Sequence, residues 1–172
     1  GLDTLRAFLD DGYQTVQDRS LYVRFQVKAK TKEWADTSIL SWTTTPWTLP
    51  GNVALAVNPA ATYVCIPDPG EKGHWLVLGE EAWRNMVEKH LFPPEYRSRL
   101  MLDDIDAFKG KDMVVIEYES LFAVKELHSP RSHRVLAADF VTMDEGTGVV
   151  HTAVMYGQED FELGTKTNLP KF

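Results

Sequence analysis

The run from Trp42 to Asn52, Trp-Thr-Thr-Thr-Pro-Trp-Thr-Leu-Pro-Gly-Asn, constrains the fold of this chain more than any other segment. It lies between two apolar, strand-like runs, 39–42 and 53–57. Pro46 ends the first strand because proline cannot donate to a sheet ladder, and Pro50-Gly51 forms a turn before the second strand. A rigid loop thus holds threonine hydroxyls, an amide and two indoles close together. This composition is that of a small polar pocket with an aromatic side.

Six side chains of this loop are candidates for contact with a bound molecule. They are Thr43, Thr44, Thr45, Trp47, Thr48 and Asn52. Threonine is also a good strand residue, so three in a row indicate by themselves no more than a strand end. A plain hairpin, however, needs neither the two tryptophans nor the two prolines, and their presence favours a functional loop.

The rest of the chain contains many short apolar runs and few helical patterns. Apolar and polar residues alternate over 21–27, which predicts a half-buried strand. Further strands are expected at 37–42, 53–57, 63–66, 74–78, 113–118 and 148–151, and a short one is expected within 135–141. Helices are expected at 2–9, 80–91 and 158–167, while 95–111 is ambiguous. The predicted fold is α+β and β-rich, a single domain over 1–172 with a β-barrel-like body and a few peripheral helices.

Composition limits the classes of function. The net charge of −7 argues against a broad nucleic-acid-binding face, although contact with a few nucleotides at a strand end needs little positive charge. The only cysteine, Cys65, excludes an internal disulfide and is interpreted as a small buried apolar residue. The five histidines show no ligand spacing, so no metal and no cofactor is expected. No apolar run approaches the roughly 20 residues of a membrane span, and no signal peptide is recognised, so a cytoplasmic location is expected.

A second motif lies about one hundred residues after the first. Residues 145–153 read Glu-Gly-Thr-Gly-Val-Val-His-Thr-Ala, a glycine-containing turn followed by a buried strand that ends near His151. Asp160 follows nine residues later, near the start of an expected helix. Each residue has an ordinary structural explanation, since histidines often satisfy a core hydrogen bond and carboxylates favour helix N-termini.

Together and in this order, the two motifs resemble the editing domain of isoleucyl-tRNA synthetase. The resemblance runs from the strand near Tyr22 to Asp160 and so covers nearly the whole chain. Related valyl and leucyl enzymes carry Thr-Thr-Arg-Pro in the first motif, whereas this chain has Thr45 in place of the arginine, which favours the isoleucyl branch. The signatures of the synthetic active site are absent, so the chain resembles an excised insertion domain without adenylation chemistry of its own.

The resemblance implies hydrolytic proofreading: deacylation of mischarged valyl-tRNA(Ile), and of valyl-adenylate as a second candidate substrate. It implies that Asp160 anchors the substrate ammonium and that His151 limits side-chain size. Trp47 and the threonine methyl groups would complete the wall, and the hydroxyls of the loop, with Asn52, would hold the terminal adenosine and a water. General-base catalysis by His151 is the alternative role for that ring. The expected partners are the 3′ aminoacylated end of tRNA(Ile) and the rest of the synthetase, with the isolated domain a monomer.

Two other functions stay open. The family often has Pro-Gly-His-Gly after His-Thr-Ala, whereas residues 154–157 here are Val-Met-Tyr-Gly. This departure is compatible with a module that binds the tRNA acceptor end without hydrolysis. The second alternative is the editing domain of a valyl or leucyl paralogue, which Thr45 disfavours.

Overall fold

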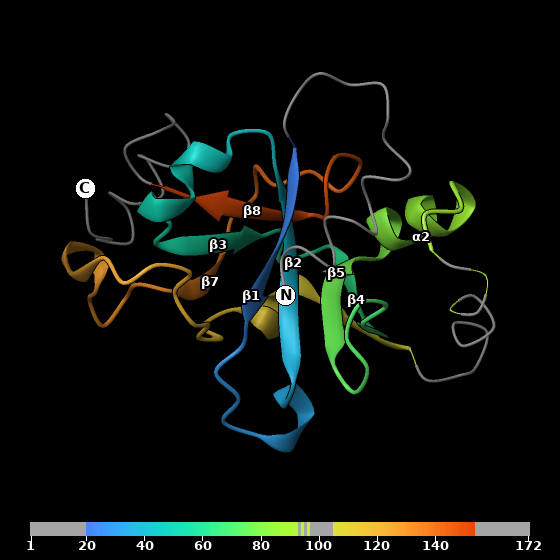
Figure 1. Cartoon of the computed structure of the whole chain (residues 1–172), viewed down its shortest axis with the longest axis horizontal. Coiled ribbons are helices and arrows are strands. Elements are labelled where there is room, and N and C mark those ends of the chain that lie inside the picture. Colours follow the sequence, from blue (N-terminus) through green and yellow to red (C-terminus); the bar gives the residue numbers. More distant parts are fainter. Residues whose placement is uncertain (1–19, 93, 95, 97–104, 154–172) are drawn as a thin grey trace.

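The computed structural model describes residues 20–92, 94, 96 and 105–153, which form two sheets and an α-helix (Figure 1). The strands are β1 (Leu21–Gln26), β2 (Thr37–Thr43), β3 (Ala54–Val57), β4 (Thr62–Pro67), β5 (Trp75–Gly79), β6 (Asp106–Lys109), β7 (Arg134–Ala137) and β8 (Val149–Thr152). The helices are α2 (Glu80–Glu88) and four short 3₁₀ helices, η1 (Lys32–Trp34), η2 (Pro46–Gly51), η3 (Gly110–Met113) and η4 (Lys125–Leu127).

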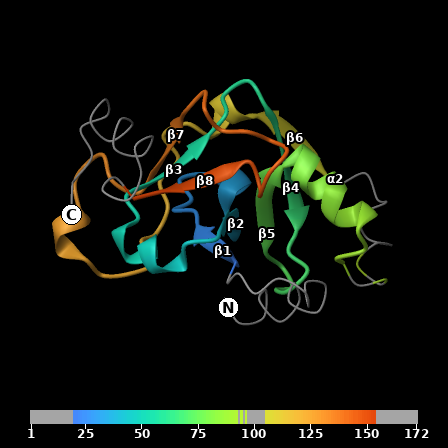
Figure 2. The ribbon, with the colours of Figure 1, turned by 90° about the horizontal axis from the view of Figure 1, so that it is seen from above.

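The larger sheet has the strand order β1-β2-β5-β4-β6, and the smaller has β7-β3-β8. In the larger sheet only β2 and β5 are parallel. In the smaller sheet β3 is parallel to β7 and antiparallel to β8, with Leu55 opposite His151. The small sheet runs across β1 and β2, and α2 lies beside β4 and β5 on the side away from β3 (Figures 1 and 2).

Side chains alternate across the larger sheet and feed two separate cores. Ile39 and Val77 point toward the smaller sheet, where they pack with Leu55. Their chain neighbours point to the opposite face, as expected from the period of two in a strand. The core on that face contains Leu40, Val64, Ile66, Leu76, Leu78, Ala82 and Met86. The larger sheet is thus buried on both faces, with α2 covering one and the smaller sheet the other.

The strand-rich α+β class is confirmed, but the described residues form no closed barrel. The sheets are joined near one edge by two isolated bridges, Val27 with Tyr118 and Glu117 with Arg134. Between β2 and β8 a side chain links the two sheets, since the Ser41 hydroxyl donates to the carbonyl of Val149 at 2.8 Å. Single bridges and side-chain bonds replace the continuous ladder that closure would need.

The strand predicted at 113–118 is wrong. Val115 has a φ of 69°, in the left-handed region, where an extended strand cannot continue. Glu117 and Tyr118 therefore make only isolated bridges. The structure instead places a strand, β6, inside the stretch that the sequence left ambiguous.

The other predicted strands are present with small shifts of their ends, and the helix predicted at 80–91 is α2, which ends at Glu88. The helices predicted at 2–9 and 158–167 lie outside the described residues. Within the described ranges, no helix combines the length and the apolar character needed to cross a membrane.

Candidate functional site

The threonine-rich loop is held by its own hydrogen bonds where β2 ends. The Thr45 amide donates to Thr43 Oγ1 at 3.1 Å, and the Thr48 hydroxyl donates to the Thr45 carbonyl at 2.8 Å. Pro46 opens η2, a position where its missing N–H costs no hydrogen bond. The loop conformation is therefore supported by contacts between residues close in the sequence.

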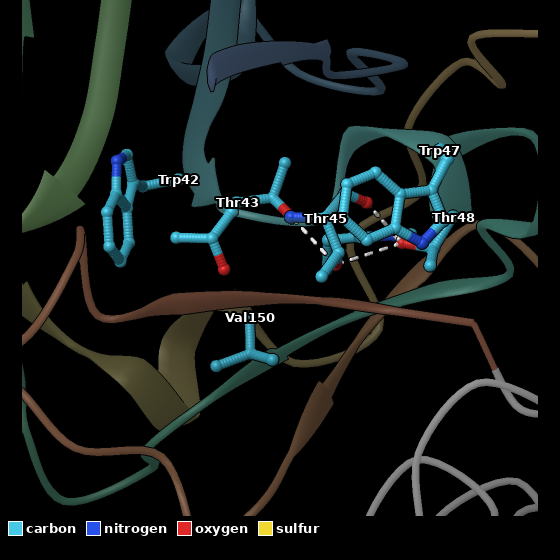
Figure 3. A pocket seen from close by; sticks show the side chains of 8 residues that line it. Trp42, Thr43, Thr45, Trp47, Thr48 and Val150 are labelled. Carbon is cyan, nitrogen blue, oxygen red and sulfur yellow. Dashed lines mark hydrogen bonds between the residues drawn. The ribbon is translucent and has the colours of Figure 1, made fainter. Parts of the chain in front are cut away.

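A cavity of about 310 Å³ lies at this loop and brings the two sequence motifs together. Its lining consists of Trp42, Thr43, Thr44, Thr45, Trp47, Thr48, Val150 and His151. In Figure 3, Trp42 lies at one end, Trp47, Thr45 and Thr48 lie at the other, and Val150 lies on β8, below Thr43 in this view. This volume is at the small end of the range of ligand pockets.

The cavity has a buried rear and an open rim. Thr43, Thr48 and His151 are buried, whereas Thr44 and Thr45 are exposed. The Trp47 side chain is 68% exposed, which is unusual for an indole beside a cavity. An exposed aromatic face of this kind can stack on another planar ring.

His151 is bonded through both ring nitrogens. Nε2 lies 2.9 Å from Thr48 Oγ1, and Nδ1 lies 2.7 Å from the side-chain amide nitrogen of Asn52. Burial lowers the pKa of His151 from 6.5 to about 4, and the backbone of Thr48 opposes this shift only in part. The imidazole is therefore neutral at pH 7.

Asn52 does not line the cavity but lies behind His151. It is buried, and its side chain also contacts the Ala54 carbonyl at 3.1 Å and the Tyr118 hydroxyl at 2.5 Å. The structure thus brings together seven of the eight predicted site residues, six of them in the lining and Asn52 behind it. The eighth, Asp160, lies outside the described residues, as does the divergent loop at 154–157.

Sequence reasoning missed three residues of this region. Trp42 and Val150 belong to the two motifs and could have been found from their place beside Thr43 and His151. Tyr118 had no such signal, because it is distant from both motifs in the sequence and lies in a segment predicted as a strand.

The part of the chain that is described contains no group of three histidine, cysteine or acidic residues placed to hold a metal ion. Burial, with Asp106 nearby, raises the pKa of the Cys65 thiol to about 11, so the thiol stays protonated at pH 7.

Comparison with known proteins identifies relatives of the whole segment. A scan against models of protein families finds no match. The chain is 40% identical over 159 residues to the isoleucine–tRNA ligase of Clostridium novyi, a match that covers 92% of this chain. It is 37% identical over 169 residues to the isoleucine–tRNA ligase of Pyrococcus furiosus, which covers 93% of the chain. The chain spans 14% and 15% of the lengths of these relatives.

A solved structure gives the fold. The editing domain of the P. knowlesi cytosolic leucyl-tRNA synthetase matches with a TM-score of 0.61, over 91% of this chain and 67% of that one. The sequence identity is only 14%, so this similarity establishes a shared architecture, whereas the sequence relationship is to the isoleucyl enzymes. By sequence the chain belongs to the isoleucyl-tRNA synthetase family, and it has the fold of a leucyl-tRNA synthetase editing domain.

Proposed function

We propose that the chain hydrolyses valine esters mistakenly formed on tRNA(Ile), with valyl-adenylate as a second candidate substrate. The observation that carries the proposal is the small cavity in which the threonine loop meets His151. An apolar synthetic site gains only about 1–3 kcal/mol from one extra methylene, a general range for which the isoleucyl enzyme is itself the standard example. A second, smaller pocket that admits valine and excludes isoleucine supplies the missing discrimination.

The rear and the rim of the cavity receive different roles in this proposal. His151 and the methyl groups of the threonines limit the size of the amino-acid side chain. Trp47, exposed at the rim, stacks on the terminal adenine, and the hydroxyls of Thr44 and Thr45 hold the ribose and a water near the ester carbonyl. An aminoacyl ester is already activated, so positioning and electrostatic stabilisation are sufficient for hydrolysis.

We assign the ammonium anchor to Asp160, on the resemblance alone. A carboxylate facing the α-ammonium would make a charge-assisted hydrogen bond, about twice as strong as a neutral one. Asp160→Ala is expected to reduce deacylation about 100-fold. Asp160→Glu, which keeps the charge, is the matched control and should retain more activity; full activity of Asp160→Ala would remove the residue from this role.

The remaining parts of the proposal concern context. We propose that residues 1–172 form one editing domain, monomeric in isolation and cytoplasmic. Its partners would be the 3′ end of tRNA(Ile) and the rest of a longer synthetase. The net charge of −7 suggests that this longer protein supplies most phosphate contacts.

The decisive experiment compares three substrates. Purified chain is mixed with valyl-tRNA(Ile), isoleucyl-tRNA(Ile) and threonyl-tRNA(Val), and ester hydrolysis is followed against the spontaneous rate. Rapid hydrolysis of the valyl ester, at least tenfold faster than of the isoleucyl ester, supports the proposal. Binding without hydrolysis would indicate an acceptor-end binding module instead, and preference for the threonyl ester would indicate a valyl-type editing domain.

A further inference from the structure

Behind the cavity, a chain of hydrogen bonds links Tyr118 to His151 through Asn52. The Tyr118 hydroxyl lies 2.5 Å from Asn52 Oδ1, and Asn52 Nδ2 lies 2.7 Å from His151 Nδ1. All three residues are buried, and Tyr118 is fully enclosed between Phe25 and His133, whose rings it contacts edge-on. Solvent therefore does not compete for these bonds.

A backbone group fixes which atoms donate and which accept in this series of hydrogen bonds. The Ala54 carbonyl can only accept, so the Asn52 atom 3.1 Å from it must be the amide nitrogen. That assignment leaves Oδ1 to accept from Tyr118. The two amide hydrogens then point to the Ala54 carbonyl and to His151 Nδ1.

The proton of the His151 ring is located by the same logic. Nδ1 faces an N–H donor and must present its lone pair, so the single proton of the neutral ring is on Nε2. Nε2–H then donates to Thr48 Oγ1 at 2.9 Å, and the Thr48 hydroxyl in turn donates to the Thr45 carbonyl at 2.8 Å. Donors and acceptors alternate without conflict from Tyr118 to the loop that lines the cavity.

We infer that Tyr118 and Asn52 are positioning residues that hold His151 in its Nε2–H tautomer. The ring then offers an N–H and no lone pair on the side of Thr48, so it serves as a fixed wall and not as the base that activates water. A ring bonded at both nitrogens also cannot turn to enlarge the cavity without losing both bonds. The low pKa of His151, which is caused by burial, agrees, because it leaves the ring neutral with a single proton at pH 7.

The meaning of this tautomer for catalysis rests on the proposed function, whereas the tautomer itself can be measured without any substrate. In the chain labelled with ¹⁵N-histidine, the His151 signals are those absent from His151→Gln. We expect Nδ1 in the unprotonated range and Nε2 in the protonated range at pH 7. A wild-type ring with the proton on Nδ1, or with rapid exchange between tautomers, would overturn the inference whatever the activity of the protein.

Two substitutions test the two positioning residues. Asn52→Asp keeps the shape but replaces the donor by a carboxylate that only accepts, so the proton should move to Nδ1. Tyr118→Phe removes the bond that orients the amide, and the two tautomers should then exchange. Tyr63→Phe is the matched control, because Tyr63 is equally buried. Its hydroxyl donates to the Gly148 carbonyl and takes no part in the hydrogen bonds between Tyr118, Asn52 and His151.

Deacylation separates this inference from the proposed function. In an active protein, Tyr118→Phe should lower the preference for the valyl over the isoleucyl ester about tenfold, and Tyr63→Phe should leave that ratio unchanged. An inactive wild-type chain with the Nε2–H tautomer would contradict the function and support the inference. If the wild-type chain is active but Asn52→Asp leaves the tautomer unaltered, the proposed function is supported and the inference is contradicted.

Discussion

The rear and the rim of the cavity differ in how their polar groups are satisfied. At the rear, His151 and Asn52 are buried and bonded to protein partners through both polar ends of each side chain. At the rim, Thr44, Thr45 and Trp47 are exposed. A bonded, enclosed wall has one shape and suits exclusion by size, whereas the exposed side chains of the rim are accessible to a nucleotide that enters from solvent.

This contrast predicts that the rear carries stability and the rim does not. Asn52→Ala leaves the Tyr118 hydroxyl, the Ala54 carbonyl and His151 Nδ1 without their partner. The expected loss is about 3–4 kcal/mol of unfolding free energy, measured by urea denaturation. Thr44→Ala at the rim should change it by less than about 0.5 kcal/mol, and similar losses for both variants would break the comparison.

Stability should also fall in acid because of His151. The pKa of His151 in the folded protein is about 4, below the ordinary 6.5. Between pH 4 and pH 6.5, His151 therefore binds a proton in the unfolded chain but not in the folded one. The neutral His151 ring therefore contributes about 3 kcal/mol to the unfolding free energy. This contribution is complete above pH 6.5 and is lost as the pH falls to 4. Unfolding free energies at several pH values should decline less steeply for His151→Gln than for the wild type. Parallel curves would show that His151 is protonated normally.

Opening the rear should relax specificity. His151→Ala removes the wall, and hydrolysis of isoleucyl-tRNA(Ile) is expected to rise roughly 30-fold relative to the valyl ester, equivalent to about 2 kcal/mol. The measurement is the ratio of kcat/KM for the two esters. A ratio equal to that of the wild type would move the size limit to other residues, with Val150→Ala as the next variant to examine.

The smallest effect is expected at the rim. Trp47→Ala removes a stacking surface that is 68% exposed, and KM for valyl-tRNA(Ile) should rise about fivefold with kcat and ester preference unchanged. Trp47→Phe keeps an aromatic face and should restore much of the affinity. A change in ester preference in Trp47→Ala would show that the rim also measures the amino-acid side chain.

The parts of the site that depend on local sequence patterns could be predicted, and the parts that depend on contacts in the folded core could not. The threonine loop and His151 were predictable, because prolines, glycines and strand patterns fix their local geometry and the cavity joins the two motifs as expected. The role of Asn52 as a partner of His151 was not, since it depends on which way one amide faces in the folded core. Tyr118 was harder to predict, because the left-handed backbone of Val115 interrupts the predicted strand at 113–118. The alternation of apolar residues does not reveal this interruption.

The fold was predictable to a similar depth. Apolar runs and alternation identified most strands, whereas burial of the larger sheet on both faces was not predicted. The pairing of those strands was not evident, because the neighbours of β3 are β7 and β8, which lie about eighty and ninety-five residues later in the chain. Such non-local contacts leave no periodic signature in the sequence.

The antiparallel pairing of β3 with β8 has a consequence for protein synthesis. Leu55 and its neighbours in β3 emerge from the ribosome long before β8, the strand that brings His151 and Val150 to the loop. Until residue 152 has been made, the threonine loop faces no opposite wall, and the nascent chain lacks the cavity. The cavity therefore forms only when β8, its last strand, pairs with β3.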